Sequence, residues 1–215
     1  MIKKLFVHWH TAWTGKPLKT ELALTLAALI ATLSCFSSFV NWVETRQGVV
    51  LADPVLAMIK PVDVTWLTFM LIYAGLLSAL FAVSFHPRRL IMSMQAYTLM
   101  VVFRTAAMYV LPLEPPPAMI PLQDPLVEII GTGQLLTRDL FFSGHTATMF
   151  ILFLCVPQKK FKAVLLFGTG VLAICLLCQH VHYTVDVLAA PFFAYGAFRI
   201  TFLFHQIFKS KDIML

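Results

Sequence analysis

The sequence predicts an all-α integral membrane protein, a bundle of six transmembrane helices that forms a single domain. Of its 215 residues, 60% are hydrophobic and only 12% are charged, and its mean hydropathy is +0.84. Soluble domains have about 25% charged residues, so this composition excludes an ordinary soluble protein. A membrane span needs roughly 20 apolar residues, and the length accommodates six such runs with short loops.

The apolar runs are separated by polar, basic or proline-containing segments. Pro87, in a basic turn, ends the second run. Residues 1–17 contain Trp9 and Trp13, four positions apart, and predict an interfacial segment. Residues 112–139 are rich in proline and predict a stiff loop over one membrane face. The first run lacks a small-residue cleavage site and is expected to be retained as a span. We expect the spans at Leu18–Trp42, Val62–Phe85, Leu90–Leu111, Leu140–Val156, Ala163–Gln179 and His182–His205.

The basic residues predict the topology, because cytoplasmic loops are enriched in Lys and Arg. Six alternating spans place most of them on one side, which we expect to be cytoplasmic together with both termini. The net charge of +6 follows from this bias, so we expect a membrane bilayer and no nucleic acid as partner. The cytoplasmic set is Lys3, Lys4, Lys16, Lys19, Arg88, Arg89, Lys159, Lys160, Lys162, Arg199, Lys209 and Lys211, against Arg46, Lys60, Arg104 and Arg138 on the other side.

Two short polar stretches interrupt the apolar sequence and predict an active site. His182 and Asp186 are four residues apart, so on a helix they share one face, where the carboxylate can orient the imidazole. His145 follows Ser143-Gly144, which reads as the first turn of another helix, where backbone N–H groups can receive an anion. The topology brings both stretches to the non-cytoplasmic face.

Arg104 lies inside the third expected span, about two turns from its outer end. A charge at this depth is costly unless it is paired or lines a wet cavity, so it is a candidate for function. Its planar guanidinium suits a phosphate. An ion pair with Asp139 or Asp186 is the alternative reading.

The four cysteines, Cys35, Cys155, Cys175 and Cys178, all lie in apolar runs. The Cys175-x-x-Cys178 pair could bind a metal or undergo redox chemistry, but no second Cys/His pair stands at zinc-like spacing. We therefore expect small buried apolar residues, no metal site and no cofactor.

These residues resemble a known family. Ser143-Gly144-His145-Thr146, followed by His182-Tyr183-Thr184-Val185-Asp186, is similar to motifs of the sphingomyelin synthase branch of the type 2 phosphatidic acid phosphatase superfamily. Two further stretches resemble that branch, Arg104-x4-Tyr109-Val110 and Asp139-Leu140-Phe141-Phe142. The motifs cover about 30 residues, and the six expected spans agree with the family's membrane bundle.

The resemblance implies phosphoryl transfer through a phosphohistidine at a membrane surface. His182, oriented by Asp186, would attack the phosphorus of a phospholipid donor, and His145 would protonate the diacylglycerol oxygen and later act as base toward a lipid alcohol acceptor such as ceramide. Arg104 and the backbone around Ser143 and Gly144 would supply donors. The phosphatase motifs Lys-x6-Arg-Pro and Ser-Arg are absent, and Arg138 replaces the branch's Gly before Asp139.

Other assignments stay open from the sequence. His180 shapes the pocket or hydrogen-bonds a neighbouring span, and Tyr109, Tyr183 and Asp139 support the site or only pack. A lipid phosphatase or phospholipase C-like hydrolase is the second functional hypothesis, and a non-catalytic lipid transporter or scaffold is the third. The oligomeric state, including a homo-oligomer, and the choice between a bacterial inner membrane and a Golgi or plasma membrane are not determined.

Overall fold

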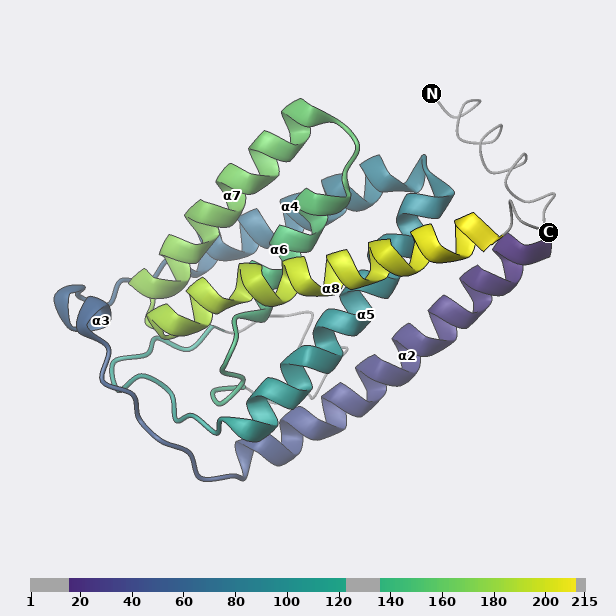
Figure 1. Ribbon diagram of the computed structural model, residues 1–215. Helices are drawn as coiled ribbons and strands as arrows, with labels where there is room; N and C mark the ends of the chain where they lie inside the picture. The colour runs from purple at the N-terminus through teal and green to yellow at the C-terminus, as the bar shows by residue number, and fades with distance from the viewer. Residues whose placement is uncertain (1–15, 123–135, 212–215) are drawn as a thin grey trace.

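The computed structural model describes residues 16–122 and 136–211, and over these residues the protein is helical, with no strand beyond one isolated bridge between Val49 and Leu113. The expected interfacial segment, apart from its last two residues, and the middle of the proline-rich loop lie outside the described ranges. The helices are α2 (Lys16–Glu44), α3 (Pro54–Met58), α4 (Thr65–Ser84), α5 (Pro87–Val110), α6 (Gly144–Cys155), α7 (Lys159–Cys178) and α8 (Thr184–Lys211) (Figure 1).

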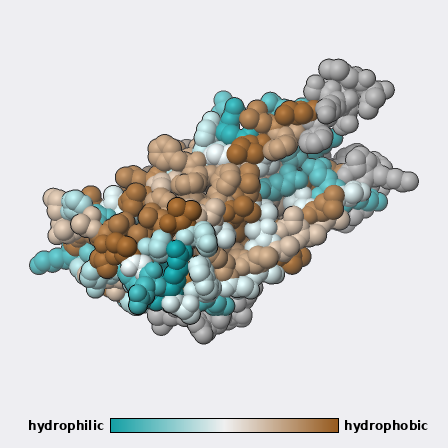
Figure 2. Space-filling view, turned by 60° about the horizontal axis from the view of Figure 1, so that its bottom comes forward, coloured by the Kyte–Doolittle hydropathy of each residue, from teal (hydrophilic) through white to brown (hydrophobic). Residues whose placement is uncertain are grey.

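Five of these helices, α2, α4, α5, α7 and α8, are long and apolar enough to cross a membrane. They coincide with five of the six expected spans, which supports a multi-pass integral membrane protein. In the space-filling view, hydrophobic residues cover a broad area across the middle of the visible face (Figure 2). An exposed hydrophobic area of this kind is suited to contact with membrane lipid.

The structure does not confirm the prediction of a sixth full span at Leu140–Val156. The helix in this segment, α6, has only 12 residues, which at 1.5 Å per residue is about 18 Å against a hydrocarbon core of about 30 Å. Residues 140–143 are not helical: Ser143 instead caps the helix, its hydroxyl oxygen accepting a hydrogen bond from the Thr146 N–H. The sequence is apolar enough for a span, but these residues belong to the candidate site.

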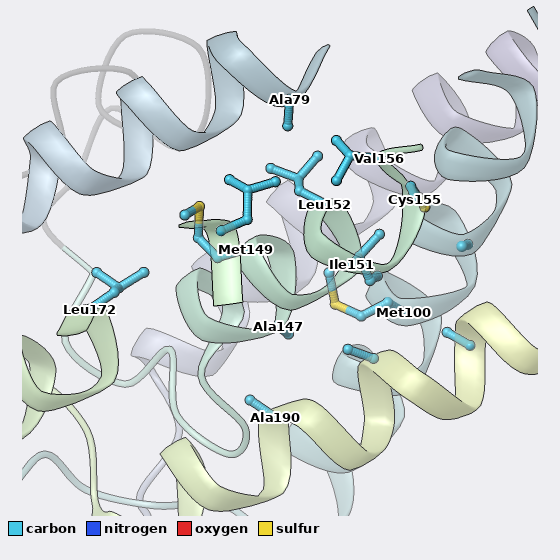
Figure 3. Close-up of a cluster of buried hydrophobic side chains, with 14 of the residues drawn as sticks. Ala79, Met100, Ala147, Met149, Ile151, Leu152, Cys155, Val156, Leu172 and Ala190 are labelled. Atoms are coloured by element: carbon cyan, nitrogen blue, oxygen red, sulfur yellow. The ribbon is translucent and has the colours of Figure 1, made fainter. Parts of the chain in front are cut away.

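Helix α6 lies at the centre of the bundle and packs on α4, α5, α7 and α8. Its side chains Met149, Ile151 and Leu152 are almost fully buried and form the core with residues of the surrounding helices (Figure 3). Gly75 of α4 permits the close approach, because a Cβ there would lie 2.3 Å from the Met149 Cε atom. The central helix is therefore held on all sides, and its first residue is fixed relative to the neighbouring helices.

Helix α2 packs chiefly on α5 and is the most peripheral of the long helices (Figure 1). Most of its side chains are exposed, among them Leu24 and Ile30 at 67% and 63%.

Cys35 lies on this exposed surface, so the expectation that all four cysteines are buried is wrong for this one. Cys155 and Cys175 are buried and Cys178 is half-buried, as expected of small apolar residues, and all four thiols are free.

Candidate active site

The last turns of α5 and the first turns of α6 and α8 lie toward the same end of the bundle and carry the predicted residues (Figure 1). Arg104 comes from the last third of α5, Ser143 and His145 from the start of α6, and Asp186 from the first turn of α8. The backbone N–H of Ser143 donates to the Asp186 carbonyl at 3.1 Å. This bond directly joins the two motifs that lie about 40 residues apart in the sequence.

Arg104 is 3% exposed, and its guanidinium is held by oxygen atoms of the segment before α6. It donates to the Phe142 carbonyl, to the Asp139 carbonyl at 3.0 Å and to the Asp139 carboxylate at 2.7 Å. The ion pair offsets the cost of a buried charge. Since a guanidinium has five N–H donors, these bonds to described residues leave donors that a phosphate can use.

Gly144, the first residue of α6, lies against this guanidinium. A Cβ at this position would come within 2.8 Å of an Arg104 terminal nitrogen and 2.9 Å of its Cζ. A larger residue at this position would therefore displace the guanidinium or the start of α6. The Gly144 N–H lies at the helix start, where the first N–H groups have no partner inside the helix, so it is a donor for an anion.

His182 and Asp186 are in contact, with 3.4 Å between His182 Nδ1 and Asp186 Oδ2. The expected reason was a shared helix face, but α8 begins at Thr184, so His182 precedes the helix and Asp186 lies in its first turn. The carboxylate reaches back over the helix start and also accepts from the Tyr183 N–H at 3.2 Å. With Nδ1 directed at Asp186, Nε2 is the ring nitrogen available to attack or to take a proton.

Burial determines the protonation of His182, which is 3% exposed. Burial lowers the pKa of His182 below its ordinary value, although the bond to Asp186 opposes the shift. Burial therefore favours the neutral imidazole, and a neutral ring is what a nucleophile or a general base requires.

His145 and Asp139 complete the group electrostatically. Burial alone would raise the pKa of Asp139, but the nearby Arg104, followed by His182 and His145, holds this pKa below its ordinary value. Both imidazoles thus add, after Arg104, to the lowering of the Asp139 pKa. His145 is half-buried, consistent with access from outside, whereas His182 and Asp186 are buried.

We expected the backbone N–H of Ser143 to bind a phosphate, but in the structure this N–H already has a partner inside the protein. Its N–H donates to the Asp186 carbonyl, and its hydroxyl accepts from the N–H and the hydroxyl of Thr146, at 3.4 and 3.1 Å. Ser143 is fully buried. Its contacts hold the start of α6 against the start of α8, so the Ser143 N–H is already used inside the protein.

His180 ends α7 rather than entering the group around Arg104. Its N–H donates to the Leu177 carbonyl and the Val181 N–H to the Leu176 carbonyl, a Schellman ending in which His180, at φ 56°, takes the left-handed position usual for glycine. The ring nitrogen Nε2 lies 3.0 Å from the Ile59 carbonyl, in the segment before α4. Of the two readings of His180, the structure shows the hydrogen bond to a neighbouring segment.

Tyr109 lies apart from the histidines. It is 61% exposed and stacks on Trp42 of α2 at 6.1 Å, with the Arg46 guanidinium over both rings. Tyr183, in contrast, is buried beside the site, and its hydroxyl donates to the Glu114 carbonyl at 2.9 Å.

A frame of charged residues around the site was not assigned from the sequence. Arg138, the residue before Asp139, donates to the Glu114 carboxylate at 2.9 Å and to the Glu44 carbonyl, and its N–H donates to the Glu44 carboxylate at 2.7 Å. Glu114 in turn accepts from the Gly48 N–H at 2.9 Å. Here Arg138, where the branch has glycine, joins the end of α2 to the loops beside the site. We find no local sequence signal that pairs these residues.

Asp53 was also missed, although the sequence carries a signal for it. The Asp53-Pro54 pair reads as a helix cap followed by proline at the first position. The carboxylate caps α3 and also accepts from the Thr184 N–H at 2.7 Å and the Thr184 hydroxyl at 3.0 Å, at the start of α8. One side chain thus anchors the helix that carries Asp186.

This arrangement is suited to transfer of a phosphoryl group. It offers a neutral imidazole with a free ring nitrogen, a second imidazole, a held guanidinium and a helix N-terminus, which together can attack phosphorus, move a proton and stabilise negative charge. Within residues 16–122 and 136–211, no cluster of three or more His, Cys, Asp or Glu side chains could hold a metal ion.

Comparison with known families agrees with this chemistry. Residues 138–205 match the family model described as PAP2 superfamily C-terminal. This match includes both histidine motifs but not Arg104. It supports the PAP2 superfamily, whose members are typically enzymes that act on phosphate esters, and it is not specific to the sphingomyelin synthase branch. No curated protein matches the chain.

Proposed function

We propose that this protein is a membrane lipid phosphotransferase that moves a phospho-headgroup from a glycerophospholipid to a lipid alcohol such as ceramide and releases diacylglycerol. The observation that supports it most is the convergence of the Arg104–Asp139 pair with the His182–Asp186 pair through the Ser143 N–H to Asp186 carbonyl bond. The superfamily match supports chemistry on phosphate esters, and the likeness to the sphingomyelin synthase motifs supports transfer.

The proposed reaction has two steps. The Nε2 atom of His182 attacks phosphorus, the bond between phosphorus and the diacylglycerol oxygen breaks, and His145 gives that oxygen a proton. His145 then takes the proton of the acceptor hydroxyl, whose oxygen attacks phosphorus, and the phosphorus–nitrogen bond to His182 breaks. Arg104 and the Gly144 N–H stabilise the non-bridging oxygens in both steps.

The expected location is the non-cytoplasmic face, because the site lies at the end of the bundle away from the basic turn 86–89 and the basic loop 158–162.

Asp186 holds the His182 ring for attack. Arg138 and Asp53 act at a distance by holding the segments that carry Asp139 and Asp186.

A product assay tests this proposal. Purified protein in detergent is given isotope-labelled phosphatidylcholine, phosphatidylethanolamine or phosphatidic acid, with and without ceramide, and the lipids are identified by mass spectrometry. We expect diacylglycerol together with a new lipid that carries the headgroup, lost in His182→Ala and retained in His205→Ala, whose ring bonds Gln95 far from the site.

The assay also separates the alternatives. Free phosphate or a free phospho-headgroup without a lipid product would show a hydrolase that uses water as acceptor. Equal activity of His182→Ala and the unmodified protein would refute the phosphohistidine.

A further inference from the structure

An open groove of about 540 Å³ lies between the segment around the start of α3 and the first turns of α8. We call it the α3–α8 groove. One wall is the loop 51–55 and the other is α8. The apolar residues that line it include Leu51, Pro54, Val55, Val185, Leu188 and Phe192.

The polar groups at the groove already have partners inside the protein. The Asp53 carboxylate accepts from Thr184 and from the N–H groups of Val55 and Leu56. The Tyr183 hydroxyl donates to a carbonyl at 2.9 Å and accepts from the Leu51 N–H at 3.2 Å. The remaining lining surface is hydrocarbon, so the groove suits an apolar ligand and offers little to a polar one.

The groove continues along a helix that is long and apolar enough to cross a membrane. Val185, Leu188, Ala189 and Phe192 follow the spacing of one helix face, so the lining extends about 10 Å down α8. Leu188 and Phe192 are 63% and 78% exposed, and these side chains are open to the lipid rather than packed in the bundle. An occupant would therefore lie at the depth of acyl chains.

The groove is also connected to the candidate site. Tyr183 lines the groove, its N–H donates to Asp186 Oδ2 at 3.2 Å, and it directly follows His182. We propose that the α3–α8 groove holds one acyl chain of the lipid substrate while the headgroup is at His182. This assignment rests on the proposed function and makes long-chain phospholipids, rather than soluble phosphate esters, the substrate class.

Photolabelling tests the groove without requiring turnover. The full-length protein is placed in phosphatidylcholine vesicles that contain a trace of phosphatidylcholine with a diazirine in one acyl chain, and adducts are mapped by mass spectrometry after irradiation. We expect adducts on both walls, in residues 51–55 and 185–192. Lipid bound to the outer surface of α8 alone would label only the second wall.

Filling the groove provides the matched comparison. Leu188→Trp is expected to reduce labelling of residues 51–55 at least fivefold, and Val55→Trp should do the same from the other wall. Leu203→Trp changes a 44% exposed leucine on the same helix outside the groove and should leave labelling unchanged. Equal labelling of residues 51–55 in all three variants would overturn the assignment.

Kinetics separate this inference from the proposed function. Leu188→Trp should raise KM at least tenfold for a donor with two 16-carbon chains, leave kcat unchanged, and have little effect on a donor with two 6-carbon chains. Turnover with the same KM in Leu188→Trp and Leu203→Trp overturns the groove and leaves the function standing. Labelling that depends on Leu188 in a protein that turns over no donor supports a lipid-binding groove but overturns the function.

Discussion

Gly144 is the position where the structure makes its sharpest quantitative prediction. In Gly144→Ala the added Cβ would lie 2.8 Å from an Arg104 nitrogen, whereas ordinary contacts begin at 3.4 Å. Either the guanidinium or the start of α6 must move by about 0.6 Å, the difference between these distances. Arg104 is held by the Phe142 carbonyl and by two oxygens of Asp139, so the movement weakens charged hydrogen bonds.

The expected magnitude follows from this displacement. Overpacking a filled interior costs about 1–3 kcal/mol, and a misplacement of about 1 Å in a reacting group can lower a rate roughly 100-fold. We therefore expect Gly144→Ala to lower kcat about 10- to 100-fold and to lower the thermal midpoint. The measurements are diacylglycerol release by mass spectrometry and thermal unfolding of the same detergent preparation.

Gly170→Ala is the matched control, because a Cβ at Gly170 meets nothing within 4 Å and the position is inside α7. Alanine is favoured over glycine inside a helix by about 0.5–1 kcal/mol, so this variant should keep its activity, and its thermal midpoint should stay the same or rise slightly. If Gly144→Ala behaves like Gly170→Ala in both measurements, the fixed position of Arg104 is not needed and the reasoning about the site is wrong.

Three further predictions concern the same region. Asp186→Asn should lower kcat about 10²- to 10⁴-fold with the protein still folded, because an amide does not fix the His182 tautomer; diacylglycerol release measures it, and a loss below threefold would contradict the assigned contact. The pKa of His182 is lowered by burial, so this group must lose its proton for activity and the acid limb of kcat/KM should lie below the ordinary histidine value of about 6.5; a limb above that value would refute the neutral, buried imidazole. Arg138→Gln should destabilise the protein by about 1–3 kcal/mol through loss of the charged bond to Glu114, whereas Arg88→Gln, an exposed residue, should not; thermal unfolding compares the two, and equal midpoints would show that the frame contributes nothing.

Some of the site residues could be predicted from the sequence around them, and others could not. His145, His182 and Asp186 could be found from the sequence, because polar residues in apolar surroundings are costly and their spacing has a chemical meaning. Arg104 was found for the same reason. The spacing of His182 and Asp186 predicted their contact correctly, but not the whole reason for it. The helix begins between them, and the Asp186 carboxylate reaches back over the helix start to His182.

Other features depend on contacts that no local pattern records. Arg138 with Glu44 and Glu114, and Asp53 with Thr184, join segments separated by between 24 and 131 residues. The short length of α6 has a similar origin. The segment Leu140–Ser143 is as apolar as a span, but its backbone groups form hydrogen bonds with Arg104 and Asp186. Helix propensity and hydropathy do not include such partners.

The sequence by itself determined the membrane class of the protein, five of its long helices and the two histidine motifs, because these follow from composition, run length and the cost of polar groups in apolar surroundings. Only the tertiary structure decided that Gly144 lies against Arg104, that the Ser143 N–H is used by Asp186, and that an apolar groove adjoins the site. The physical reason is that each of these depends on the distance between helix ends, which is set by packing around α6 and not by neighbours in the chain.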